Sequence, residues 1–241
     1  MLQAANMIEL GQIRAALVVG TEGGRELVDN TIDTLNADTS LTRQQVKLAV
    51  ASLTIGSGSC AVLLTDRELS RTGNRLLAAV TRANTDHHDL CHSRGGDEAA
   101  AGGMRPLMDT DSERLMREGI ATGRETFKRL LDEVAWSRGE IDKTFCHQVG
   151  VAHQRGMFEA LGLDAAVDFS TVEFLGNTGS VALPITMALG IERGRLSPHD
   201  RVAMLGIGSG INSIMLAVDW QQSPLAPPQT VPAVAAHGVS T

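Results

Sequence analysis

The order of apolar and polar positions predicts strands and helices that alternate along most of the chain. Apolar runs of strand length lie at 13–20, 60–65, 75–82, 141–145, 200–207 and 211–220, with a short extended run at 169–174. Helical patterns lie at 41–53, 111–136, 151–161 and 180–193, and residues 1–10 resemble the last turns of a helix that Gly11 closes. This alternation predicts a layered α/β fold whose sheets are covered on both faces.

Glycine and serine mark two similar turns in this pattern. Gly-Ser turns at 56–59 and 206–210 each lead into an apolar strand, and this similarity is a sign of internal duplication. The second turn lies between two apolar runs, so residues 200–220 are predicted to form a hairpin. The strand at 75–82 is expected beside the strand at 60–65. Residues 22–36 show no clean period, and 84–106 is predicted to be a long loop.

Composition and charge narrow the function. The 21 Lys and Arg against 28 Asp and Glu give a net charge of −7, with no dense basic patch, which disfavours nucleic acid and acidic membrane surfaces as partners. The amino terminus lacks the pattern of a signal peptide, and no stretch reaches the length of a membrane span. Three widely spaced cysteines argue against a disulfide framework, so we expect a cytoplasmic protein.

Two polar residues follow predicted strands and are candidates for chemistry. His147 ends the strand at 141–145, and Asn177 lies in the turn 176–179, so both stand where open α/β sheets present functional groups. Structural roles are equally open at this point. A histidine at a strand end is often only a hydrogen-bonded rim residue, and an asparagine between glycines often only shapes a turn.

No cysteine is an obvious partner for the histidine. Cys146 precedes His147 in an extended segment, where neighbouring side chains are expected on opposite faces, and Cys60 is expected to be a small buried hydrophobe. Cys91 lies near His87, His88 and His92, but the ligand spacing of a zinc site is incomplete, so no metal is predicted. The turn at 206–210 precedes a strand rather than a helix, which disfavours nucleotide binding.

Three ordered motifs resemble the 3-oxoacyl-acyl-carrier-protein synthase III group of thiolase-fold condensing enzymes. They are FCHQVG at 145–150, LGNTGS at 175–180 and GIGSGIN at 206–212. The amino-acid sequences of these motifs are most similar to those of the branch that condenses two acyl-CoA chains head to head at the start of olefin biosynthesis. The likeness covers about residues 1–220.

The resemblance implies a thiolase-like layered α-β-α-β-α fold and a Cys–His–Asn active site. His147 and Asn177 match the family's histidine and asparagine, which donate hydrogen bonds to the carbonyl oxygen of the second thioester. The backbone N–H of Ser209 matches an oxyanion-hole donor. The implied substrates are acyl-CoA or acyl-carrier-protein thioesters, with no permanently bound cofactor, and the full-length parent is expected to be a homodimer.

The family's nucleophile has no counterpart among Cys60, Cys91 and Cys146. We therefore expect an amino-terminally truncated chain that is inactive alone in condensation. The expected organisation is a remnant of the amino-terminal thiolase half at 1–83, a linker at 84–110, the carboxy-terminal half at 111–220 and a disordered tail at 221–241.

Two other functions stay open at this point. The chain is also compatible with a non-catalytic subunit that pairs with a complete homologue. The second is thioester hydrolysis or acyl transfer without condensation, because a histidine and an asparagine that polarise a thioester carbonyl would serve these reactions too.

Overall fold

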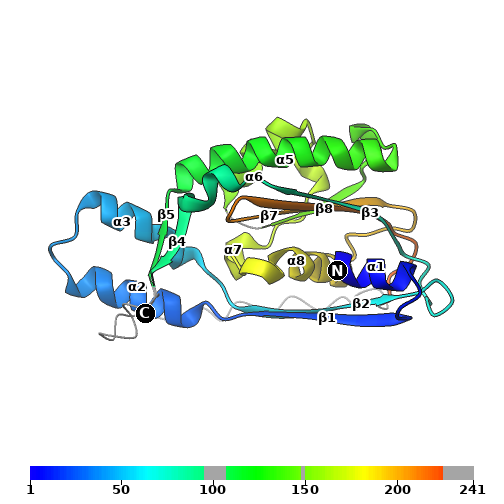
Figure 1. The fold of residues 1–241 in the computed structure, drawn as a ribbon, viewed down its shortest axis with the longest axis horizontal. Helices are drawn as coiled ribbons and strands as arrows, with labels where there is room; N and C mark the ends of the chain where they lie inside the picture. Colours follow the sequence, from blue (N-terminus) through cyan, green and yellow to red (C-terminus); the bar gives the residue numbers. More distant parts are fainter. Residues whose placement is uncertain (95–106, 148–149, 225–241) are drawn as a thin grey trace, which may run out of the picture.

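A four-stranded mixed sheet forms the centre of the molecule (Figure 1). The structure is a computed structural model that describes residues 1–94, 107–147 and 150–224. The strand order is β3-β8-β7-β6, from β3 (Arg75–Ala83), β8 (Asn212–Asp219), β7 (Arg201–Gly208) and β6 (Lys143–Cys146). Strand β6 runs parallel to β7, and the other pairs are antiparallel.

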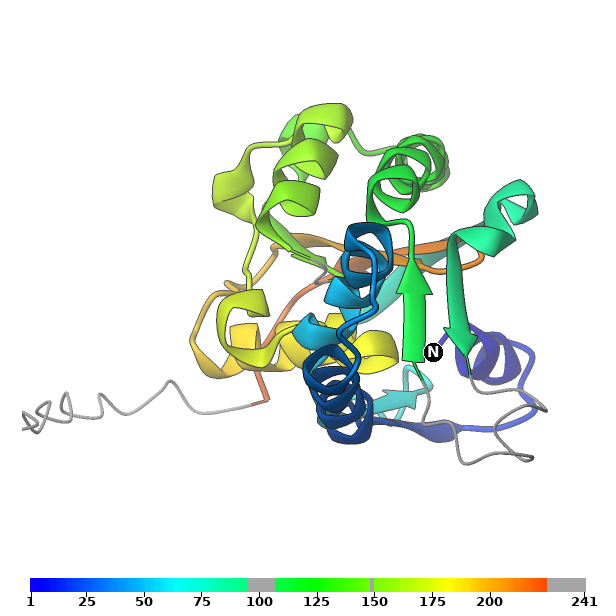
Figure 2. The same ribbon diagram turned by 90° about the vertical axis from the view of Figure 1, so that its left-hand side faces the viewer.

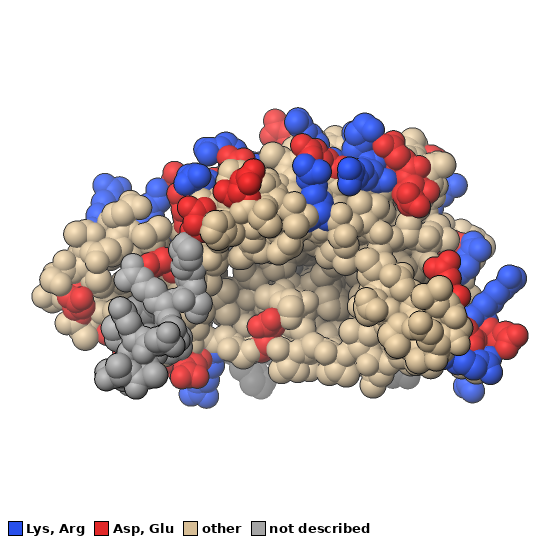
Figure 3. Space-filling view, viewed as in Figure 1, with Lys and Arg blue, Asp and Glu red and all other residues tan. Residues whose placement is uncertain are grey.

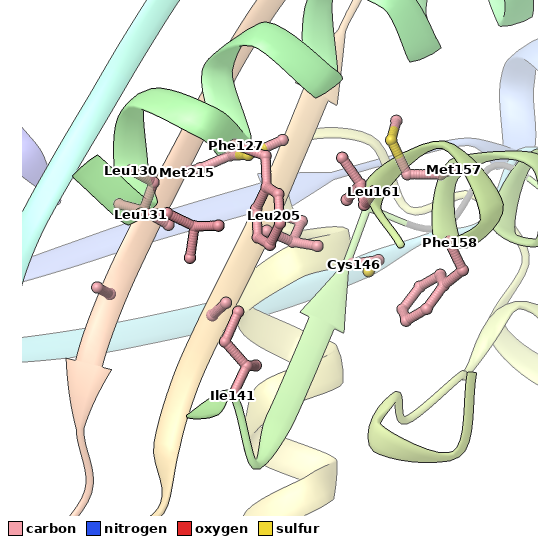
Figure 4. Close-up of a cluster of buried hydrophobic side chains, with 12 residues drawn as sticks. Phe127, Leu130, Leu131, Ile141, Cys146, Met157, Phe158, Leu161, Leu205 and Met215 are labelled. Carbon is pink, nitrogen blue, oxygen red and sulfur yellow. The ribbon is translucent and has the colours of Figure 1, made fainter. Parts of the chain in front are cut away.

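Helices cover both faces of this sheet. Helices α5 (Ser112–Val134) and α6 (Val151–Leu161) lie on one face and α8 (Ala182–Glu192) on the other, as Figures 1 and 2 show. Figure 4 shows the first interface, where apolar side chains of α5 and α6 meet the sheet. The alternation along β6 explains the arrangement, because Cys146 packs in this cluster and Phe145 in the one toward α8.

A two-stranded ribbon forms a further layer beyond α8. Strands β1 (Ala15–Glu22) and β2 (Gly58–Thr65) pair antiparallel and contact α8 and helix α1 (Leu2–Glu9). The outer face of the ribbon is apolar and open to solvent among the described residues: Leu17, Val19 and Leu63 are 64%, 61% and 64% exposed. The molecule thus shows the layers helix, sheet, helix and sheet in sequence (Figure 1).

The remaining elements lie beside these layers or connect them. At the left of Figure 1 are α2 (Arg25–Ala37), α3 (Arg43–Ala49), β4 (Cys91–Arg94) and β5 (Leu107–Thr110). The short helices are η1 (Val50–Thr54), η2 (Thr85–Leu90), η3 (Arg138–Glu140), η4 (Ala165–Val167), α7 (Val172–Leu175) and η5 (Gly179–Val181). No helix in the described part of the chain is long and apolar enough to cross a membrane.

The structure confirms several predicted elements. Helix α6 matches the predicted range, and Gly162 ends it in the left-handed conformation. Helix α5 begins where predicted, because the Asp111 carboxylate accepts a hydrogen bond from the N–H of Arg114. Strands β7 and β8 form the predicted hairpin, and Gly11 has the positive φ expected of a residue that closes α1.

Other predictions were wrong. Residues 25–37 form helix α2, whose buried positions, Asn30 and Thr31, are polar and hide its period. Residues 172–175 form helix α7 rather than an extended run. Strand β3 pairs with β8 rather than β2, so part of the expected segment 1–83 shares a sheet with 111–220.

The predicted loop at 84–106 contains η2 and β4. Residues 95–106 and most of the predicted disordered tail lie outside the described residues.

Candidate active site

His147 lies at the carboxyl end of β6, as the sequence predicts. Its backbone N–H donates to the carbonyl of Leu205, with 2.9 Å between the nitrogen and oxygen atoms, which extends the β6–β7 ladder by one residue. The strand is buried up to this point because helices cover both of its faces. His147 is therefore the first partly exposed side chain beyond a buried strand.

A small recess opens beside His147. Its volume is about 10 Å³, which suffices for about one water molecule. The recess is lined from β6, α6, β7 and β8 by Cys146, His147, His153, Gln154, Met157, Phe158, Leu205, Gly206, Ile207 and Met215. An acyl chain does not fit in this volume, so the recess provides polar groups rather than a binding pocket.

Burial keeps both imidazoles of the recess neutral. The pKa of His147 falls from 6.5 to about 4, first because burial disfavours the charged ring and second because His153 is close. Burial also lowers the pKa of His153. A neutral imidazole donates a hydrogen bond from one nitrogen, so at neutral pH His147 can polarise a carbonyl oxygen.

Cys146 lines the same recess but is held by a carboxylate. Its thiol is hydrogen bonded to Asp168, and burial, then the negative charge of Asp168, raises the pKa of the thiol well above its usual value. Cys146 therefore stays a thiol at neutral pH. Cys146 and His147 both line the recess, but the pKa of Cys146 is shifted by burial and Asp168 rather than by His147, in keeping with the expectation that the two do not form an ion pair.

Asn177 is fixed by its backbone and by its side chain. The segment 54–56 pairs with it: the N–H of Asn177 donates to Thr54, and the N–H of Gly56 donates to Asn177, each across 2.8 Å. The side-chain oxygen Oδ1 accepts from the N–H of Gly179 across 3.0 Å. Asn177 thus shapes the turn, and its Nδ2 group is the one left to donate toward a ligand.

The glycines around Asn177 permit a close crossing of two backbones. A Cβ atom on Gly56 would lie 1.9 Å from the carbonyl oxygen of Leu175, and one on Gly176 would lie 2.6 Å from that of Thr54. Gly176 also has φ +67°, which side chains other than glycine rarely adopt. Gly56 and Gly176 are therefore both needed for the two backbone segments to cross at this distance.

Ser209 lies at the turn of the β7–β8 hairpin and is exposed. Its carbonyl accepts a hydrogen bond from Nδ2 of Asn212 across 3.0 Å. The strand residues just before it, Gly206 and Ile207, line the recess of His147. The hairpin therefore brings the turn with Ser209 to the end of the sheet that holds His147.

The structure brings the predicted site residues together only in part. His147 lines the recess, whereas Asn177 and Ser209 are not among its lining residues. Sequence reasoning did not select His153, Gln154 or Asp168. A buried Asp168 between apolar residues is the signal that indicates such a network, because a carboxylate in that setting needs donors.

The other two cysteines lie away from this recess. Cys60 is partly buried in β2, and burial raises its pKa, as expected of a small hydrophobe. The Cys91 sulfur lies 3.5 Å from the Thr110 hydroxyl. In residues 1–94, 107–147 and 150–224, no cluster of three or more histidine, cysteine, aspartate or glutamate side chains is arranged to hold a metal ion.

Comparison with known proteins identifies relatives of the chain. Residues 131–220 match the family model "3-oxoacyl-[acyl-carrier-protein (ACP)] synthase III C terminal". The chain is 41% identical over 91% of its length to an acyl-CoA:acyl-CoA alkyltransferase of Shewanella oneidensis, and 32% identical over 90% to that of Xanthomonas campestris. It is 26% identical over 89% of its length to a beta-ketoacyl-[acyl-carrier-protein] synthase III of Ruegeria.

Solved structures show the same arrangement. A cerulenin-bound OleA of Xanthomonas campestris superposes with a TM-score of 0.84 at 32% identity, covering 91% of this chain and 61% of that one. The 3-oxoacyl-(acyl carrier protein) synthase III, FabH, of Xanthomonas oryzae gives 0.82 at 32% identity, covering 91% of this chain and 62% of that one.

The chain spans 63%, 61% and 61% of the lengths of the three relatives named above. The match with OleA and FabH confirms the predicted thiolase-like α/β fold. The chain is thus related over about nine-tenths of its length to condensing enzymes of the 3-oxoacyl-acyl-carrier-protein synthase III and acyl-CoA:acyl-CoA alkyltransferase type.

Proposed function

We propose that this chain is the carboxy-terminal portion of an acyltransferase that joins two acyl thioesters by Claisen condensation, in fatty acid or hydrocarbon biosynthesis. The observation that carries the proposal is His147, a neutral and partly buried imidazole at the end of β6 in a chain related to condensing enzymes. In such a condensation the α-carbon of one thioester loses a proton to a base or a carboxylate as CO2. It then attacks the carbonyl carbon of the other thioester, and a thiolate leaves.

His147 and Asn177 act in this proposal on the second thioester. The N–H of the neutral imidazole and the Nδ2 group of Asn177 donate hydrogen bonds to its carbonyl oxygen, where negative charge develops as the enolate forms. A protonated His147 would still have an N–H to donate, but burial disfavours the charged ring, so the neutral imidazole is the donor. The backbone N–H of Ser209 donates to the carbonyl oxygen of the first acyl group.

The nucleophile of the proposed reaction is none of the three cysteines of this chain. Cys146 is held as a thiol by Asp168, Cys60 is partly buried in a strand, and Cys91 contacts Thr110. The 241 residues alone are therefore inactive in condensation in this proposal.

The proposed substrates are acyl-CoA or acyl-carrier-protein thioesters, without a permanently bound cofactor. The net charge of −7 favours CoA thioesters over an acidic carrier protein. The complete enzyme is proposed to be a homodimer in the cytoplasm.

A chimera tests this proposal. The part of the Shewanella oneidensis alkyltransferase that this chain does not match is fused to the chain, and condensation of a long-chain acyl-CoA is followed by product mass. We expect the chimera to form the condensed product and His147→Ala or Asn177→Ala to lower its rate at least about 100-fold. Product formation at the unmodified rate by both variants would contradict the proposed roles.

A second candidate is a non-catalytic subunit that pairs with a complete homologue. The exposed apolar face of β1 and β2, with Leu17, Val19 and Leu63, favours it. Figure 3 shows that charged side chains gather over α5 on the viewed face, while the band between α5 and the ribbon is almost free of them. Co-expression with the Shewanella protein tests this candidate, since Leu17→Lys with Leu63→Lys should abolish a stable complex.

A further inference from the structure

Asp168 is a carboxylate held between two elements of the site. It is 8% exposed, follows η4 in the chain and forms an isolated bridge with Thr144 of β6. Its Oδ1 accepts from the Thr144 hydroxyl across 2.9 Å, and its Oδ2 accepts from Nε2 of Gln154 across 2.5 Å. The Cys146 thiol and the N–H of Phe169 also donate to it. These donors satisfy a charge that burial makes costly.

The side-chain donors to Asp168 come from β6 and from α6, the two elements next to which, or in which, the two imidazoles lie. Cys146 directly precedes His147 at the end of β6, and Gln154 directly follows His153 in the first turn of α6. One carboxylate therefore ties the end of the strand to the start of the helix. Because His147 and His153 line the same recess, this tie fixes how closely the two rings approach.

We propose that Asp168 is a positioning residue of the site: through Cys146 and Thr144 on β6 and Gln154 on α6, it holds His147 and His153 together in one narrow recess. The inference rests on the proposed function, in which His147 donates a hydrogen bond from a fixed place. Asp168 itself does not line the recess and is assigned no contact with a substrate.

A carboxylate suits this position for a simple reason. Its side-chain donors are a hydroxyl, an amide N–H and a thiol, and a carboxylate accepts from all of them. An asparagine has the same shape, but its NH2 group would face one of these donors. Asp168→Asn therefore breaks one arm of the tie with little change in volume.

The recess contains few groups that can titrate. They are Cys146 from β6, and His147 and His153 at either end of the connection, with Asp168 in contact with Cys146. The lining residues from β7 and β8 are apolar or glycine: Leu205, Gly206, Ile207 and Met215. Among the described residues, the midpoint of His147 thus depends on burial and on the nearby His153, and the midpoint of His153 depends on burial.

The experiment is an NMR titration of the imidazole nitrogens in the full 241-residue chain. In Asp168→Asn, we expect the midpoints of His147 and His153 to rise by about one pH unit, because a loosened recess admits water. Asp164→Asn is the matched control, since Asp164 precedes η4 as Asp168 follows it, but its side chain accepts only from the N–H of Ala166 among the described residues. A purely structural role would lower the melting temperature without moving the midpoints of the folded protein.

Unchanged midpoints in folded Asp168→Asn would overturn the proposal. If that variant does not fold, Gln154→Leu decides, because it removes only the arm from α6: a rise in the His153 midpoint supports the proposal, and no change overturns it. The titration needs no acyl substrate. An inactive chimera with shifted midpoints would therefore refute the proposed function alone, and an active one with unshifted midpoints would refute the positioning role alone.

Discussion

The N–H of Gly56 donates a hydrogen bond to the carbonyl of Asn177, with 2.8 Å between the two atoms. This bond joins the Gly-Ser turn before β2 to the turn that carries the candidate asparagine. Two motifs that are 121 residues apart (177 − 56) in the sequence therefore form one local structure. The position of Asn177 depends on the amino-terminal segment as well as on its own turn.

Gly56→Ala tests this crossing. Its Cβ atom would lie 1.9 Å from the backbone oxygen of Leu175, which cannot move aside as a flexible side chain does. We expect a loss of about 2–4 kcal/mol in the free energy of unfolding, measured by urea denaturation. Gly23→Ala is the control, because nothing lies within 4 Å of the added atom. Equal stability of the two variants would show that the crossing is looser than described.

Glu22 supports the same turn from β1. Its Oε1 accepts from the N–H of Ser180 across 3.0 Å and from the Ser180 hydroxyl across 2.6 Å. Glu22→Ala should therefore cost about 1 kcal/mol in unfolding free energy. Glu159→Ala at an exposed position of α6 should cost less than about 0.5 kcal/mol. A loss no larger at Glu22 than at Glu159 would remove this support from the account.

The neutral state of His147 predicts a pH dependence of stability. Its pKa is about 4 in the folded chain and about 6.5 when unfolded, so between these values the unfolded chain binds more protons. Stability is complete above about pH 6.5 and falls as the pH drops toward 4, by about 2–3 kcal/mol for this group. Urea denaturation across this range measures the slope. His147→Gln should reduce this slope to the part that His153 contributes, and an unchanged slope would contradict the assignment.

Cys146 should resist alkylation in the native chain. It is 7% exposed, and its thiol pKa lies well above the usual value, so little thiolate is present at pH 8. We expect iodoacetamide to modify Cys146 at least about 10-fold more slowly in the native chain than in urea, as followed by peptide mass spectrometry. Equal rates in the two states would mean that Cys146 is reactive.

Local patterns predict the elements best where apolar spacing and a stop signal agree. Helix α6 has both, because its apolar face ends at Gly162, which adopts the left-handed conformation. Helix α2 buries Asn30 and Thr31, so its buried face is not apolar. Helix α7 has four residues, too few for a helical period to appear.

Long-range pairing is what sequence patterns do not contain. Strand β3 pairs with β8, across more than 120 residues, and no local signal selects that partner over β2. The same holds for the site. His147 can be recognised as a polar residue at a strand end, whereas the hydrogen bond between Gln154 of α6 and Asp168 after η4 forms only in the folded chain.

Intact mass after incubation with a long-chain acyl-CoA tests the central claim most directly. We predict that the 241-residue chain keeps its mass, because none of Cys60, Cys91 and Cys146 is the nucleophile, whereas the chimera with the Shewanella segment gains one acyl group. An acyl adduct on the 241-residue chain itself would contradict the account and place the reactive cysteine within it.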